Sequence, residues 1–124
     1  MYDSFGDLIP IMAKDGYVIC FNASDEDYDM EQHFVNDCGW SKREFKTIEG
    51  YEWFVARVSA WKDGVELGYS VLGCCCYAEL VDFYDKANEQ FIELVDEAIE
   101  DARNKELHDY RKLATQDPLT SLMQ

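Results

Sequence analysis

Carboxylates are the side chains whose spacing offers the most chemistry in this sequence. Seven of them fall between residues 82 and 100, mostly three or four positions apart, a spacing that places side chains on one face of an α-helix. They are Asp82, Asp85, Glu89, Glu93, Asp96, Glu97 and Glu100. On a helix, neighbours in this row lie ~5 to 6 Å apart along the axis, similar to successive phosphates on one nucleic-acid strand, and the row spans ~27 Å. Such a row can bind a cationic groove on another protein.

A second group of acidic residues lies between residues 25 and 31. Its members are Asp25, Glu26, Asp27, Asp29 and Glu31. The alternate acids at 25, 27 and 29 match the first three ligands of a calcium-binding loop. The sixth position, however, is Met30 where such a loop needs Gly, and the twelfth is Asn36 where it needs a bidentate Glu. A regular calcium loop is therefore excluded, while weak surface binding of cations is not. We expect these five residues to form a second partner-binding patch on the polar face of a short helix.

Motifs for catalysis or metal binding are missing from the sequence. It contains no Gly-rich phosphate loop, no nucleophile elbow and no HExxH motif. His33 and His108 fall in helical patterns set by other residues, so both are predicted at the surface or its boundary. The five cysteines lack zinc spacing, and three are consecutive, which predicts core filling in a strand with Cys74 and Cys76 on one side and Cys75 on the other. We therefore expect no enzyme, cofactor or metal, although a site of scattered residues would leave no motif.

The composition predicts a folded, strongly acidic domain. The 124 residues include 26 Asp and Glu against 11 Lys and Arg, for a formal net charge of -15, and 48% are hydrophobic. That hydrophobic share is too high for a disordered acidic tail. The charge repels nucleic acid and anionic membranes, and it attracts cationic protein surfaces. With no apolar leader and no run of ~18 apolar residues, we expect a cytoplasmic protein with one domain over residues 1–124 and a frayed tail at 115–124.

Strand patterns occupy most of the first 77 residues. The strongest is a β-hairpin, with arms at residues 53–61 and 66–72 and a two-residue turn at Asp63-Gly64. That turn pairs Val58 with Tyr69, and it places residues 54, 56, 58, 60, 67, 69 and 71 on one apolar face. Residues 17–21 predict another strand. Residues 8–14 are either a short helix or the first arm of a hairpin turning at Asp15-Gly16, and a further strand is predicted at residues 45–48.

Two helices are predicted around the acidic groups. The first begins at Ser24, which with Asp27 resembles a capping box, and it ends at Gly39. The second runs from about Ala78 to Ala114, with a bend or a projecting end left open beyond residue 102. Its apolar residues follow helical spacing: Leu80, Tyr84, Ala87, Phe91, Leu94 and Ala98. These elements predict an α+β fold, in which a three- to four-stranded antiparallel sheet carries a short acidic helix and a long C-terminal amphipathic helix on one face.

The like charges of the acidic row bear on function. Pairs such as Glu89/Glu93 and Glu93/Glu97 each cost ~0.2 to 0.5 kcal/mol on a helix, and a row that weakens the fold is better explained by a basic partner than by solubility. We therefore expect an inhibitor that occupies the nucleic-acid-binding surface of a host defence protein. In size, acidity and lack of catalytic motifs the chain resembles anti-restriction and anti-CRISPR proteins of phages, a likeness of kind without a shared motif. The alternatives are an antitoxin or immunity protein that neutralises a basic toxin, and a small protein-protein adaptor.

Overall fold

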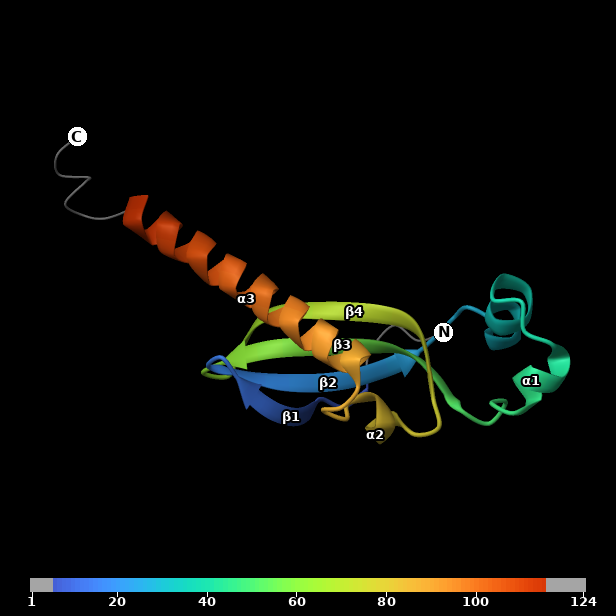
Figure 1. The fold of residues 1–124 in the computed structure, drawn as a ribbon. Coiled ribbons are helices and arrows are strands. Elements are labelled where there is room, and N and C mark those ends of the chain that lie inside the picture. The colour runs from blue at the N-terminus through green and yellow to red at the C-terminus, as the bar shows by residue number, and fades with distance from the viewer. Residues whose placement is uncertain (1–5, 116–124) are drawn as a thin grey trace.

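A four-stranded antiparallel sheet forms the body of the protein. The computed structural model describes residues 6–115, with side chains up to residue 109. Of the tail predicted at 115–124, residue 115 ends α3 and residues 116–124 lie outside the described residues. The strands are β1 (Ile9–Lys14), β2 (Tyr17–Asp25), β3 (Glu52–Lys62) and β4 (Val65–Tyr77), and they are ordered β1-β2-β3-β4. The long helix α3 (Glu89–Thr115) crosses one face of this sheet (Figure 1). The predicted α+β fold is confirmed.

Three short helical segments complete the described chain. A π-helix, η1 (Gln32–Asp37), and α1 (Lys42–Lys46) lie in the connection between β2 and β3, and α2 (Leu80–Phe83) lies between β4 and α3. In Figure 1 the segment with η1 and α1 extends beyond the end of the sheet. We call residues 26–51 the lobe. It stands apart from the core, which lies between the sheet and α3.

Both predicted two-residue turns are present. Asp15 and Gly16 have φ of 53° and 88°, and Asp63 and Gly64 have φ of 53° and 77°. Positive φ at both central residues is the geometry of a type I′ turn, whose twist matches that of the flanking strands. Residues 9–14 are therefore the first arm of a hairpin, which decides between the two interpretations of that segment.

The predicted register of the second hairpin is wrong by one residue. Val58 pairs with Ser70 and not with Tyr69, because the register shifts between Ala60 and Trp61. Such a β-bulge places an extra residue on one strand, and every side chain beyond it then changes face. The apolar pattern of β3 survives this shift, but that of β4 is reversed.

The corrected register decides which side of β4 meets α3. Tyr69 and Val71, predicted to face the core, lie on the outer side of the sheet with 51% and 46% of their surface exposed. Gly68 and Ser70 face the helix instead, and both are buried. The Ser70 hydroxyl donates to the Leu94 carbonyl of α3 at 2.7 Å. Small residues at this contact allow the helix backbone to approach the strand closely.

Two other predictions fail, one at the end of β2 and one in the lobe. Ser24 is not a helix cap, because β2 continues through Asp25 and the helical turn begins only at Met30. Of the strand predicted at residues 45–48, residues 45–46 belong to helix α1 and residues 47–48 to the turn that follows it. The N-terminus of α1 is a capping box in which the Ser41 hydroxyl accepts from the Glu44 N–H and the Glu44 carboxylate accepts from the Ser41 N–H, both at 3.1 Å. This Ser-x-x-Glu motif outweighs the apolar alternation around it.

The helix predicted over residues 78–114 is interrupted after Phe83. Residues 84–88 form a turn, in which the Asn88 side chain donates to the Phe83 carbonyl at 2.7 Å and accepts from the Gln90 N–H at 3.2 Å. Asn88 therefore caps the start of α3. Of the predicted apolar row, Phe91, Leu94 and Ala98 are buried, Leu80 and Tyr84 are half-buried, and Ala87 is exposed. Beyond the sheet the C-terminal end of α3 projects freely, as Figure 1 shows.

Candidate partner-binding surface

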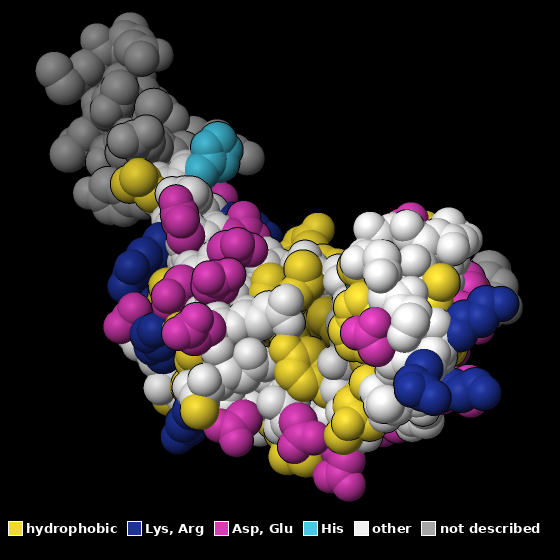
Figure 2. All heavy atoms as spheres, turned by 45° about the vertical axis from the view of Figure 1, so that its right-hand side comes forward, with side chains coloured by type: hydrophobic (Ala, Val, Ile, Leu, Met, Phe, Trp, Pro, Cys, Tyr) yellow, Lys and Arg dark blue, Asp and Glu magenta, His cyan; other side chains and the backbone are white. Residues whose placement is uncertain are grey.

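Four unpaired carboxylates line the outer face of α3. They are Glu89, Glu93, Glu97 and Glu100, all exposed, and within the described residues none of them makes a hydrogen bond or an ion pair. Phe91, Val95 and Ala98 hold the opposite face of the helix in the core with 0% exposure. Figure 2 shows acidic side chains gathered along this helix. We call these four residues the α3 row, and at 1.5 Å per residue it spans ~16 Å.

The two flanks of α3 differ in charge balance. Toward the hairpin of β1 and β2, Lys14 pairs with Asp96 at 2.8 Å and Arg103 pairs with Asp15 at 3.2 Å. Toward β4, the Asp101 carboxylate accepts the backbone N–H of Tyr69 at 3.0 Å. The predicted site residue Asp96 is thus neutralised by Lys14, although its exposed position beside the α3 row is as predicted.

Asp82 and Asp85 are not part of the α3 row, because the chain breaks between them and α3. Asp82 belongs to α2, where its carboxylate accepts the Glu79 N–H at 3.2 Å. Asp85 lies in the following turn and accepts the Ala87 N–H at 2.8 Å. Both side chains are exposed. The continuous row of ~27 Å predicted from the sequence is therefore wrong, and the regular part is the shorter α3 row.

Glu26 of the second acidic group anchors the lobe to the sheet. Its carboxylate is half-buried and accepts the N–H of Cys74 at 2.7 Å and that of Tyr28 at 3.1 Å. Burial alone would raise the pKa of Glu26, but these N–H donors outweigh it and lower the pKa below its usual value. Cys74 has a φ of 55°, so the anchor holds a strained residue at the irregular part of β4.

The other members of the second group do not share one helix face as predicted. Asp25 ends β2, and Asp27 precedes the helical turn. The Asp29 carboxylate accepts the Gln32 N–H at 2.9 Å at the start of η1. Asp25, Asp27, Asp29 and Glu31 are exposed. They are spread from the end of β2 to the start of the helical turn in the lobe.

Sequence reasoning missed Asp101, the carboxylate that binds the edge of β4. Its position four residues after Glu97 was a usable signal, since that spacing places the two side chains on the same flank of the helix. The predicted register concealed this contact, because it placed Tyr69 on the wrong face of the sheet.

Within the described residues, one histidine contacts a cysteine: Nε2 of His33 lies 3.7 Å from Sγ of exposed Cys38. His33 packs against Phe34 and Trp53 with ring centroids 4.8 and 5.3 Å apart, and His108 is exposed on α3. Burial raises the pKa of the Cys75 thiol to about 12, so it stays protonated and unreactive at neutral pH. No group of three or more His, Cys, Asp or Glu within residues 6–109 is arranged to hold a metal ion.

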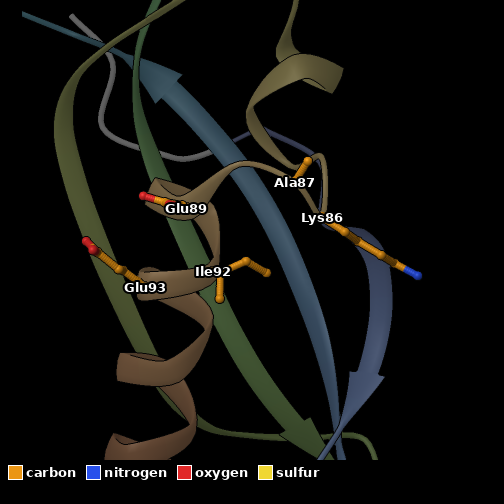
Figure 3. A pocket seen from close by; sticks show the side chains of 5 residues that line it. All are labelled: Lys86, Ala87, Glu89, Ile92 and Glu93. Atoms are coloured by element: carbon orange, nitrogen blue, oxygen red, sulfur yellow. The ribbon is translucent and has the colours of Figure 1, made fainter.

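A shallow hollow of about 260 Å³ lies at the start of α3. Lys86, Ala87, Glu89, Ile92 and Glu93 line it. In Figure 3 the two carboxylates point one way and Lys86 points the other, so the polar groups do not converge on a common point. Convergent polar groups are what a small-molecule site needs, and this hollow lacks them.

Comparisons with known proteins assign no family to this chain. No family model, no curated protein and no solved structure matches this chain. Within the described residues, no helix combines the length and the apolar character needed to cross a membrane. Between residues 89 and 100, the outer face of the helix that covers the sheet thus presents four carboxylates without a partner among the described residues.

Proposed function

We propose that the protein is an inhibitor whose α3 row occupies the nucleic-acid-binding surface of another protein. The observation that carries this proposal is the α3 row itself, in which Glu89, Glu93, Glu97 and Glu100 stand exposed and unpaired on a helix anchored by its buried face. A rigid helix presents its charges without the entropic cost of ordering a flexible acidic segment. The steps of ~4.5 to 6 Å along the axis suit a groove lined by Lys and Arg.

The charge balance of the fold supports the same proposal. Lys14, Arg57, Lys62 and Arg103 each pair with a carboxylate elsewhere on the sheet or α3. The α3 row receives none of these cations, although neighbouring carboxylates on a helix repel one another at ~0.2 to 0.5 kcal/mol per pair. A cationic partner surface would relieve that repulsion and release its own bound anions on association.

The test is a capture experiment with matched charge reversals. The protein is immobilised, incubated with lysate of its source cells, and eluted in parallel with duplex DNA and with salt. We expect captured proteins that bind nucleic acid and that free DNA displaces. The variant Glu89→Lys/Glu93→Lys/Glu97→Lys should lose this capture, because it reverses three adjacent charges in the α3 row.

The control variant is Asp7→Lys/Glu49→Lys/Glu52→Lys, which reverses three exposed carboxylates outside both acidic groups. Each variant changes the formal net charge from -15 to -9, so only the position of the charges differs. If both variants lost capture equally, overall charge alone would explain the loss. That result would contradict the proposal. Capture of a basic toxin in place of a nucleic-acid-binding protein would favour the immunity-protein alternative, which uses the same electrostatics.

A further inference from the structure

The outer edge of β4 carries backbone groups that face no other strand. β4 is the last strand of the sheet, so one side of its backbone is open. On this side the N–H of Tyr69 donates to Asp101 at 3.0 Å, and the regular pairing of β4 with β3 ends at Gly73 and Cys74, where the register shifts. Alternate N–H groups along a strand point the same way, so the N–H of Val71 also points outward. No acceptor for it occurs among the described residues.

The stretch between Tyr69 and this irregularity can accept one more short strand. From Tyr69 to Gly73 it spans ~13 Å, which is enough to pair with about five residues of an extended chain. Its outer face presents Tyr69 and Val71, which are 51% and 46% exposed. Paired side chains on neighbouring strands contact one another, so an added strand would place apolar residues beside these two.

The other face of the added strand would meet the unneutralised flank of α3. Glu93, Glu97 and Asp101 follow one another at intervals of four residues, which places them along the flank that contacts β4. Figure 2 shows hydrophobic side chains in the hollow between α3 and the lobe, with acidic side chains beside them. Basic side chains on this face of the strand would therefore have carboxylate partners.

A second copy of the chain is a poor occupant of this edge. Pairing two β4 edges would bring the Asp101 carboxylate of each copy toward that of the other, in a protein with a formal net charge of -15. Charged side chains at an open edge are a known means of preventing pairing between copies. The same charges attract a cationic strand.

We propose that residues Tyr69–Gly73 of β4 form a strand-addition site for an extended segment of a partner protein in which basic and apolar residues alternate. Main-chain hydrogen bonds to the β4 edge give the affinity, the α3 flank selects the basic residues, and Tyr69 and Val71 contact the apolar ones. This goes beyond the proposed function, which requires only the charge of the α3 row and no strand pairing.

The test uses two capped seven-residue peptides of identical composition and charge. One alternates Lys and Val, and the other has its lysines first and its valines last. We expect the alternating peptide to bind at least about tenfold more tightly by fluorescence anisotropy. It should also slow hydrogen exchange of the Val71 amide. Equal affinity for both peptides, or unchanged exchange at Val71, overturns the proposal.

Two controls separate strand pairing from charge and from misfolding. Val71→Pro removes the outward N–H at an edge position, where Pro is tolerated, and should cost about tenfold in affinity for the alternating peptide alone. N-methylation of that peptide on the amides facing β4 should have the same effect without altering the protein. If the Val71 amide were protected from exchange in the absence of peptide because the protein self-associates, the edge would be occupied by a second copy. That result would overturn the proposal.

The charge contribution has its own matched pair of variants. Glu97→Gln removes a carboxylate on the flank toward β4, and Glu89→Gln removes one that lies about 80° further round the helix, away from that flank. We expect the first variant to weaken binding of the alternating peptide several-fold more than the second at low salt. Equal weakening would show that the flank does not select the basic residues, and it would overturn that part of the proposal. Because the peptide experiments need no nucleic-acid-binding partner, their failure is distinguishable from failure of the proposed function.

Discussion

Replacing Gly68 by Ala should push α3 away from the sheet. A Cβ atom at this position would lie 2.4 Å from the Ala102 nitrogen and 2.4 Å from the Ala98 carbonyl oxygen, both backbone atoms of α3. Since carbon contacts are comfortable at about 3.5 Å, the helix must retreat by about 1 Å. A gap of that size loses a quarter to a half of the dispersion energy along the contact between α3 and β4. We therefore expect the free energy of unfolding to fall by about 3 kcal/mol, near the top of the range for overpacked cores.

Urea unfolding followed by tryptophan fluorescence measures this loss in the free energy of unfolding. Thermal unfolding should show a midpoint lowered by about 12 °C, at about 4 °C per kcal/mol for a chain of this size. The matched control is Gly50→Ala, because a Cβ at Gly50 meets nothing within 4 Å and its φ is outside the left-handed region. That variant should be neutral or stabilised by up to about 1 kcal/mol. If Gly68→Ala lost less than about 0.5 kcal/mol, the close approach of α3 to β4 would be refuted.

Three further predictions concern the anchor, the core and the thiols. The N–H donors that hold the pKa of Glu26 low stabilise the folded state at pH values above the unfolded pKa, near 4.3. This stabilisation is lost as the pH falls through the lower pKa of the folded state. Glu26→Gln should therefore be less stable than the natural protein at pH 7, and urea titrations should show this difference in stability disappearing below about pH 4. Ser70→Ala removes the hydrogen bond to the Leu94 carbonyl and should cost about 1 kcal/mol in the same assay. In maleimide labelling read by mass spectrometry, exposed Cys38 should react in the native protein, whereas buried Cys75 should react only after unfolding; early labelling of Cys75 would contradict its burial.

Local signals in the sequence were enough to predict the elements whose geometry depends on a few neighbouring residues. Asp15-Gly16 and Asp63-Gly64 predicted both tight turns, because residues that tolerate positive φ are required there. The alternation in β3 and the spacing of Phe91, Leu94 and Ala98 predicted which faces are buried. Some local signals were also misjudged: the capping box that starts at Ser41 was readable from the sequence but was outweighed by a strand pattern.

The tertiary structure alone decided how those elements meet, and with it the shape of the candidate site. The bulge beside Trp61 reversed the two faces of β4, and no local pattern marked it because both faces of that strand carry apolar residues. Asn88 restarted the helix after Phe83, which removed Asp82 and Asp85 from the acidic row.

The sequence by itself therefore determined the acidity of the protein, its turns and the apolar face of its long helix, since these follow from side-chain type and spacing. Only the tertiary structure decided which carboxylates remain unpaired on α3 and which are bound to Lys14, Tyr69 or Cys74. The physical reason is that a carboxylate is neutralised by groups distant in the chain, whose approach depends on strand register and helix docking.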